Sequence, residues 1–255
     1  MEKENHKYLE RYPLTKAYKY LVIGTMPPAQ ELPPGVICKE KKKNQRKFSI
    51  DYFYGNAASF WKIMKELYPS NKFDSIENIQ KWQEEYCIGI TDTIKRCKRK
   101  DPCSYKDSDL IIDWSDLNHS LKGYILNHKD KIDKLIFTSG ENCNNALANF
   151  KIIMGNEFYL ISGKVISDLP SPSGGSNTSN FNSNNATLGL RKDLFDYLME
   201  MKNQSDIDYV KSQWKIKQAS NKGEKINRIP KNMLTKYKVW KYKSIFPLIK
   251  CNAST

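Results

Sequence analysis

Short apolar runs alternate with helical patterns along most of this chain, and this alternation limits the folds that it can adopt. The predicted strands cover residues 20–24, 87–90, 134–138 and, as one or two strands, 157–168. The predicted helices cover residues 57–68, 76–86 and 114–129, a segment beginning at Glu141, and residues 188–201. Strands that alternate with helices in this way predict an α/β fold with a parallel sheet and helices on both faces.

Three unusual loops follow predicted strands, after Gly24, Thr138 and Asp168. In a parallel sheet all three loops open at the carboxyl edge, which is where α/β proteins bind their ligands. The sequence therefore predicts a functional site at this edge.

Two of these loops have a composition that suits a ligand. In Gly24-Thr-Met-Pro-Pro28 the glycine lets the backbone approach a ligand closely, and the prolines fix the loop. The loop Leu169–Asn177 carries small hydroxyl residues between prolines, which can donate to phosphate oxygens and press into a DNA groove. A flexible linker is the alternative for its Ser/Asn-rich end.

An aromatic segment precedes the helix predicted at 57–68. Phe60 and Trp61 have the spacing of core residues of that helix. Phe53, Tyr54 and Asn56 come before it and are candidates for stacking against a base and hydrogen-bonding to it.

The chain carries 42 Lys and Arg against 28 Asp and Glu, a formal net charge of +14, which favours a polyanionic partner. A generally lysine-rich proteome would give the same composition. Lysines are dense in residues 215–250, with aromatic residues between them. We therefore divide the chain into an α/β domain, residues 1–204, and a basic C-terminal extension, residues 205–255.

We do not expect a membrane protein, a secreted protein or a metalloprotein. No stretch of eighteen apolar residues exists, and no secretory signal is visible, so we expect a cytoplasmic monomer that does not act in a membrane. The six cysteines form no CxxC pair and have no histidine at ligand spacing. We expect free thiols, no metal and no cofactor.

Five segments in order resemble the uracil-DNA glycosylase superfamily, nearest its mismatch-specific and hypoxanthine-type branches. They are Gly24-Thr-Met-Pro-Pro28, Tyr54-Gly-Asn-Ala-Ala-Ser-Phe-Trp61, Gly89-Ile-Thr-Asp-Thr-Ile-Lys-Arg96, Ile136-Phe-Thr-Ser-Gly140 and Leu169-Pro-Ser-Pro-Ser-Gly174. The resemblance covers residues 19–201. It implies a four-stranded parallel sheet between helices, and an enzyme that flips a damaged base, uracil or hypoxanthine, from DNA and hydrolyses its N-glycosidic bond.

The resemblance also implies roles for residues around the base. The backbone N–H groups of Thr25 and Met26, beside Gly24 and Pro27, would donate to the base, and Phe53 or Tyr54 would stack on it. Asn56 would orient the water or read the base edge. Asp92 is a second candidate for positioning the water, and an N-cap or an ion pair with Arg96 is its alternative role.

DNA would be held by two loops. Ser139, Gly140 and Asn142 would meet a phosphate at a helix N-terminus. The second set is the proline- and serine-rich loop, comprising Pro170, Ser171, Pro172, Ser173, Gly174 and Ser176.

The pattern of the family is incomplete here. Met26 stands where the mismatch-specific branch has an asparagine, and the asparagine position of the other branch falls on Ala58. Two alternatives therefore stay open: a nucleic-acid-binding protein that retains the fold without catalysis, and a small-nucleotide hydrolase, for which the charge would be unexplained.

Overall fold

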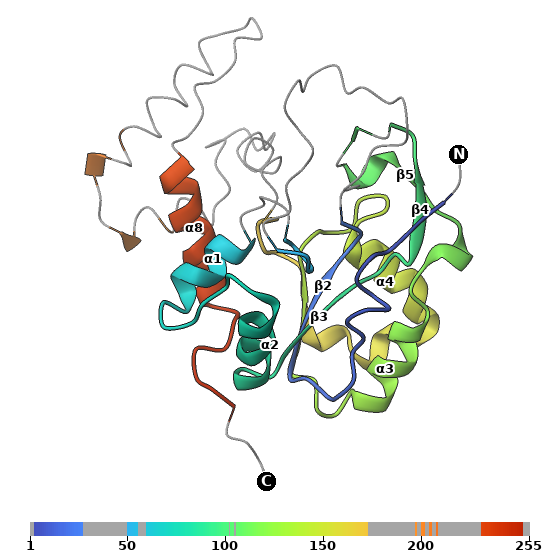
Figure 1. Cartoon of the computed structure of the whole chain (residues 1–255), viewed down its shortest axis with the longest axis horizontal. Coiled ribbons are helices and arrows are strands. Elements are labelled where there is room, and N and C mark those ends of the chain that lie inside the picture. Colours follow the sequence, from blue (N-terminus) through green and yellow to red (C-terminus); the bar gives the residue numbers. More distant parts are fainter. Residues whose placement is uncertain are drawn as a thin grey trace, which may run out of the picture.

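A central parallel sheet organises the protein (Figure 1). The computed structural model describes residues 3–27, 50–55, 60–101, 103–104, 106–172, 197, 200–201, 204–205, 208 and 231–251. The sheet has the order β3-β2-β6-β7 and consists of β2 (Tyr20–Gly24), β3 (Ile88–Asp92), β6 (Lys134–Phe137) and β7 (Val165–Ile166). All three strand pairs are parallel, which confirms the predicted α/β class and the four-stranded parallel sheet.

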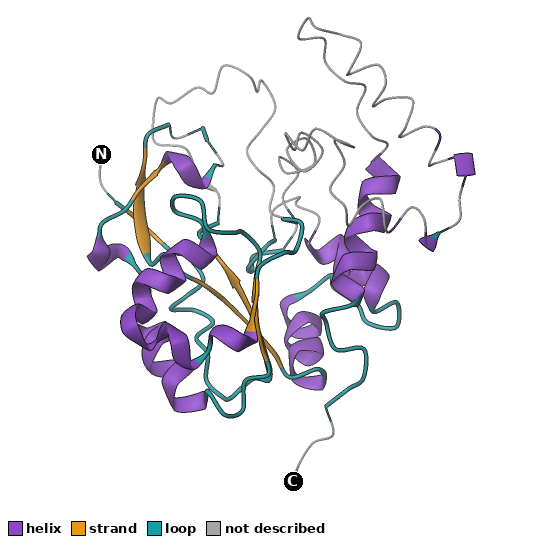
Figure 2. Ribbon diagram, turned by 180° about the vertical axis from the view of Figure 1, so that it is seen from behind, coloured by secondary structure: helices purple, strands orange, loops and turns teal. Residues whose placement is uncertain are grey.

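Helices cover both faces of this sheet (Figures 1 and 2). The helices are α1 (Phe60–Leu67), α2 (Ile76–Glu85), α3 (Ser120–His128), α4 (Ala146–Met154) and α8 (Lys231–Lys243). Helices α1, α2 and α8 lie on one side of the sheet, and α3 and α4 lie on the other. The arrangement is compatible with three α/β/α layers.

The alternation of side chains along the strands explains the two layers of core. Val22 and Ile136 point to one face, where they join the hydrophobic cluster of α1 and α2. Leu21, Ile23 and Phe137 point to the opposite face and pack with α3 and α4. Because successive strand residues face opposite sides, a run of apolar residues fills both cores at once, as expected for a sheet buried on both faces.

A second, antiparallel sheet was not predicted. It has the order β1-β4-β5 and pairs β1 (Glu4–Asn5) with β4 (Arg96–Arg99), and β4 with β5 (Leu110–Ile111). β1 and β5 are only two residues long and β4 is rich in charged residues, so these strands lack the apolar pattern that reveals a buried strand. The small sheet matters for function because it holds the N-terminal segment beside the end of β3.

The structure also contains short 3-10 helices, η1 (Asp107–Asp109), η2 (Trp114–Asp116), η3 (Gly155–Leu160) and η4 (Ser162–Lys164). Helix η2 takes up the start of the helix predicted at 114–129. Of the one or two strands predicted at 157–168, the structure has β7 alone, and η3 and η4 take up the residues before it. The helix predicted from Glu141 begins instead at Ala146, whose backbone N–H donates to the Ser139 hydroxyl at 2.8 Å.

The described part of the C-terminal segment packs against the α/β core. Helix α8 lies along α1 (Figure 2), and the side chains of Tyr242, Ile245 and Phe246 join the same hydrophobic cluster as α1 and α2. The Tyr242 hydroxyl donates to the carbonyl of Pro170 at 3.1 Å. This segment therefore contributes to the core as well as to the charge of the chain.

The cysteines differ in state. Cys87, Cys97, Cys143 and Cys251 are free thiols, whereas Cys103 is disulfide-bonded. The expectation of free thiols throughout is therefore wrong at Cys103, where a lysine- and arginine-rich loop gave no sign of a bridge. Among the described residues, no helix has the length and apolar character needed to cross a bilayer.

Candidate active site

The carboxyl ends of three strands bring polar groups together. Gly24 and Asp92 end β2 and β3 and lie opposite each other in the register. Thr138 follows β6, and its backbone N–H donates to the carbonyl of Ile23 at 3.1 Å. Since β3 and β6 lie on opposite sides of β2, this edge contains a point where the strand order reverses, the usual place for a ligand in such sheets.

Asp92 is held by a histidine from the N-terminal segment. The Nε2 atom of His6 lies 2.7 Å from Asp92 Oδ2, and both side chains are buried. The other ring nitrogen, Nδ1, accepts the backbone N–H groups of Tyr8 and Leu9 at 3.1 and 3.2 Å. Nδ1 is therefore unprotonated, so Nε2 carries the proton and donates it to Asp92. This hydrogen bond fixes the orientation of the Asp92 carboxyl group.

Tyr54 reaches across the same edge. Its hydroxyl lies 3.1 Å from the Thr138 hydroxyl, and its ring stacks on Phe60 with the ring centroids 4.4 Å apart. Burial, with the charge of Asp92 second, raises the pKa of Tyr54 well above its usual value of 10. The phenol is therefore neutral and keeps a proton to donate. Its backbone has φ 56°, a conformation that is uncommon outside glycine and often found at functional sites.

Gly24 leaves room for both Asp92 and Tyr54. A Cβ atom at Gly24 would collide with Asp92 Oδ1 and with the Tyr54 hydroxyl. Both oxygens therefore converge on the Cα of Gly24, at the end of β2. The glycine of the Gly24–Pro28 loop is required by these two side chains of the protein itself, in addition to any ligand.

A second carboxyl group, that of Asp107, belongs to the same cluster. Thr25 Oγ1 donates to Asp107 Oδ1 at 3.0 Å. The main chain of Asp107 is fixed by Asn144, whose Nδ2 donates to the Asp107 carbonyl at 3.1 Å. Burial raises the pKa of Asp107 to about 6, and the negative charge of Asp92 adds to the increase, while Arg99 and the hydrogen bond from Thr25 oppose it.

The two carboxyl groups have different partners. Asp92 is bonded to His6 and Asp107 to Thr25, and the pKa of Asp107 is about 6. Within the described part of the chain, each has one oxygen held by a hydrogen bond, Oδ2 of Asp92 and Oδ1 of Asp107. A carboxyl group whose pKa is raised towards neutrality is suited to acid–base catalysis, so Asp107 is a candidate for that role.

The raised pKa of Asp107 predicts a pH-dependent stability. The unfolded Asp107 titrates near pH 3.8 and the folded one near pH 6, so the native state binds more protons between these values and loses stability as pH rises. Asp107→Asn removes this loss, and its amide oxygen still accepts from Thr25. We expect the free energy of unfolding of the variant, relative to wild type, to increase by about 2–3 kcal/mol between pH 4 and pH 7. Urea unfolding at both pH values measures it, and a constant difference would contradict the burial of Asp107.

The structure brings together four of the residues that the sequence predicted for this site: Gly24, Thr25, Tyr54 and Asp92. The alternative roles of Asp92 are not observed. Arg96 pairs with Asp116 instead, its Nε lying 2.6 Å from Asp116 Oδ1. Asp92 ends a strand rather than opening a helix.

Of the three other predicted base contacts, Phe53 points elsewhere. Phe53 is 1% exposed and packs on His6 and Tyr8 in the core, so it has no face for a base. The side chain of Met26 packs against the hydrophobic cluster around Leu117, and the role of its backbone N–H stays a prediction. The carbonyl of Pro27 accepts from Arg99 at 2.8 Å.

The residues predicted to contact phosphate differ in their accessibility. Ser139 caps α4 through its hydroxyl, which orders the loop after β6. Asn142 is exposed, and Gly140 has open space where a side chain would project. Both remain accessible to a phosphate.

In the second loop, Pro170 and Pro172 are buried, contrary to the prediction that they press into DNA, because the loop packs beneath α8. Ser171 is half-buried. Asn56, Ser173, Gly174 and Ser176 lie outside the described residues.

Sequence reasoning missed His6, Asp107 and Thr138. His6 and Asp92 are 86 positions apart, and no motif surrounds the histidine. Asp107 lies in a polar loop among other charged residues. Only Thr138 carried a signal, because it is the last residue of a predicted strand.

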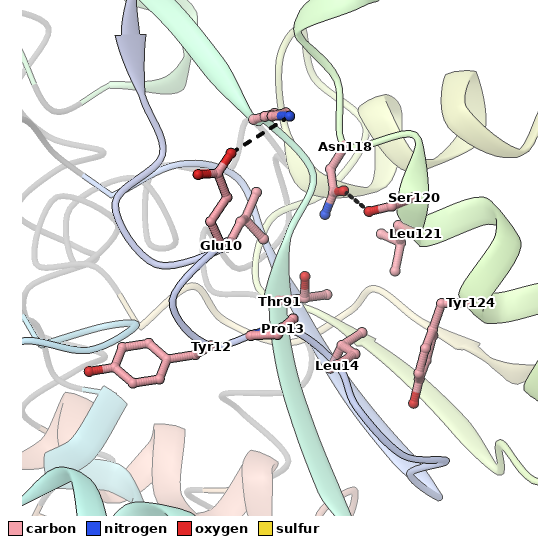
Figure 3. A pocket seen from close by; sticks show the side chains of 11 residues that line it. Glu10, Tyr12, Pro13, Leu14, Thr91, Asn118, Ser120, Leu121 and Tyr124 are labelled. Atoms are coloured by element: carbon pink, nitrogen blue, oxygen red, sulfur yellow. Dashed lines mark hydrogen bonds and ion pairs between the residues drawn. The ribbon is translucent and has the colours of Figure 1, made fainter.

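A separate cavity of about 280 Å³ lies beside β3 and the start of α3 (Figure 3). Its wall combines Leu9, Thr91 and Leu121 with polar groups. The charged pair in it, Glu10 and Lys95, is 3.8 Å apart and mutually satisfied. This cavity has none of the titratable groups that meet at the carboxyl edge, so the edge remains the candidate active site.

No group of three or more His, Cys, Asp or Glu side chains is arranged to bind a metal ion in the described ranges of the chain. Comparisons with known protein families, with curated proteins and with solved structures found no match for this chain.

Proposed function

We propose that this protein is a DNA glycosylase that flips a deaminated base from DNA and hydrolyses its N-glycosidic bond. The observation that carries the proposal is the carboxylate of Asp92, fixed by His6 at the strand edge next to Gly24 and Tyr54. The five segments that resemble the uracil-DNA glycosylase superfamily support it, since three of them supply Gly24, Tyr54 and Asp92.

The cluster accounts for the chemical requirements of this reaction. Cleavage of the bond gives the sugar oxocarbenium character and moves negative charge onto the departing base. The Asp92 carboxylate positions the attacking water and accepts its proton, and it also stabilises the positive charge on the sugar. Tyr54 offers an aromatic ring against which a flipped base stacks.

The charge of the chain supports a DNA partner. The net charge is +14, and Lys236 and Lys243 are exposed two turns apart on α8. Deleting the C-terminal extension would also remove Tyr242 and Phe246 from the hydrophobic core. Substitution of individual exposed lysines is therefore the better test of DNA binding.

We expect Lys236→Gln/Lys243→Gln to weaken DNA binding and to reduce the slope of log affinity against log salt by about 1–2, because each neutralised phosphate releases counterions. Binding measured at several salt concentrations checks this. The exposed pair Lys81 and Lys131, changed to Gln together, is the control. Equal slopes for both double variants would remove α8 from the DNA footprint.

Excision of bases from a panel of duplexes, each with one uracil or hypoxanthine, tests the proposal. The expected result is an alkali-sensitive abasic site in at least one duplex. A second candidate function is a nucleic-acid-binding protein without catalysis, favoured by Met26, whose apolar side chain packs inward where the mismatch-specific branch has an asparagine. Salt-dependent DNA binding with no abasic site in any duplex would select this candidate.

A further inference from the structure

Asp107 is an unusual carboxyl group for its surroundings. A nearby guanidinium would be its natural partner, but Arg99 donates from Nε to Glu4 at 2.6 Å and from Nη2 to the carbonyl of Pro27 at 2.8 Å. Among the described residues, Thr25 is the one group that donates to the Asp107 side chain. Within the described ranges, Asp107 is thus a half-buried carboxyl group with one donor and no bonded cation, which is poorly suited to a structural role because withdrawing a charge from water without a partner is costly.

The position of Asp107 gives this arrangement a use. Thr25 follows Gly24 at the end of β2, so its bond to Asp107 places the second carboxyl group beside the edge that holds Asp92 and Tyr54. The Asp92 Oδ1 atom and the Tyr54 hydroxyl both lie against Gly24, and Thr25, the next residue, is bonded to Asp107. Asn144 holds the main chain of Asp107 from the loop after β6.

We infer that Asp107 is the general acid of this site and that it protonates a departing purine, so that the base removed is hypoxanthine rather than uracil. This inference rests on the proposed glycosylase activity and adds the class of base to it.

The reaction balances with these two carboxyl groups. The water oxygen bonds to C1′ of the sugar and gives one proton to the Asp92 carboxylate. The C1′–N9 bond breaks, and its electron pair goes to the purine ring, which takes the proton of Asp107 at N7. The products are a free neutral purine and an abasic sugar with a hydroxyl at C1′. Transfer of a proton from Asp92 back to Asp107 through solvent restores both groups.

The class of base follows from the position of the acid. A purine linked through N9 has a basic ring nitrogen, N7, that accepts a proton as the bond breaks. Uracil linked through N1 has no basic ring nitrogen, and it departs as an anion that needs hydrogen-bond donors instead. A carboxylic acid that keeps its proton up to about pH 6 therefore fits a purine.

The charged groups around Asp107 set the expected pH dependence. Asp92 faces it from β3 and raises its pKa, and Arg99 faces it from β4 and lowers it. The outcome is a pKa of about 6, so the acid form is lost as pH rises above that value. Excision by the wild-type protein should fall above about pH 6, and this decline should be absent in Asp107→Asn.

A modified substrate tests the contact between the acid and N7 directly. Single-turnover excision is measured for the full-length protein on duplexes with hypoxanthine, 7-deazahypoxanthine or uracil. Asp107→Asn should release hypoxanthine about a hundredfold more slowly than wild type. The ratio of the hypoxanthine rate to the 7-deaza rate should fall at least about tenfold in the variant, because the acid no longer has a proton for N7. Asp130→Asn, an exposed aspartate after α3, is the matched control and should behave as wild type.

The outcomes separate this inference from the proposed function. An unchanged ratio in Asp107→Asn, or faster release of uracil than of hypoxanthine by wild type, would overturn the role of Asp107 and leave the glycosylase activity standing. Release of neither base by wild type would overturn both. A melting temperature of Asp107→Asn at or above that of wild type shows that the variant is folded.

Discussion

Replacing Asp92 by asparagine is expected to reduce base excision by at least about a thousandfold, within the range for loss of a general base. The amide oxygen of the substituted side chain would still accept from His6 Nε2, so the variant should fold and bind DNA with nearly wild-type affinity. A loss confined to the chemical step is the signature of a group that acts in the transition state. Single-turnover excision and equilibrium DNA binding together measure it.

Asp130→Asn again serves as the control, because this side chain is exposed and remote from the cluster. The opposite result has a clear meaning. If Asp92→Asn excises normally while Asn56→Ala is inactive, Asn56 positions the water and Asp92 serves to anchor the N-terminal segment through His6.

The second large effect is expected at Gly24. In Gly24→Ala the new Cβ collides with Asp92 Oδ1 and the Tyr54 hydroxyl. Neither oxygen moves freely, because Asp92 is bonded to His6 and Tyr54 is stacked on Phe60. We expect the free energy of unfolding to fall by about 1–3 kcal/mol, as in other overpacked interiors. Excision should fall at least about a hundredfold, because the displaced groups are the catalytic ones.

A matched glycine distinguishes crowding from the loss of backbone freedom. A Cβ at Gly163, in η4, would meet open space, so Gly163→Ala should change stability by less than about 0.5 kcal/mol and leave excision intact. Wild-type stability and excision in Gly24→Ala would show that Asp92 and Tyr54 do not converge on this glycine. Urea unfolding and the excision assay on both variants give the answer.

The sheet was predictable because its strands are continuous apolar runs. Tyr20–Gly24 and Lys134–Phe137 bury side chains on both faces, and this produces a signal that sequence reading detects. The antiparallel strands were not detected. In Arg96–Arg99 partly exposed charged side chains alternate with buried ones, and the strand is only four residues long. Local patterns do not reveal strands that are stabilised mainly by their partners.

The candidate site was predictable only where it follows strands. Gly24 and Asp92 end strands, so the argument from the carboxyl edge located both. His6 and Asp107 come from segments without a periodic pattern, and the small antiparallel sheet brings them to the edge. Their roles depend on tertiary contacts across 86 positions in one case and 82 in the other, which no local motif encodes. Phe53 shows the reverse error, because an aromatic residue beside a predicted site proved to be core.

The central claim is that a flipped base is bound at the carboxyl edge of β2, β3 and β6. A crystal structure of Asp92→Asn with a hypoxanthine-containing duplex tests it most directly. The base is expected against the ring of Tyr54, with its sugar beside residue 92 and its N7 within hydrogen-bonding distance of Asp107. A base that stays stacked in the duplex, or one that occupies the separate cavity lined by Leu9, Thr91 and Leu121, would contradict this account.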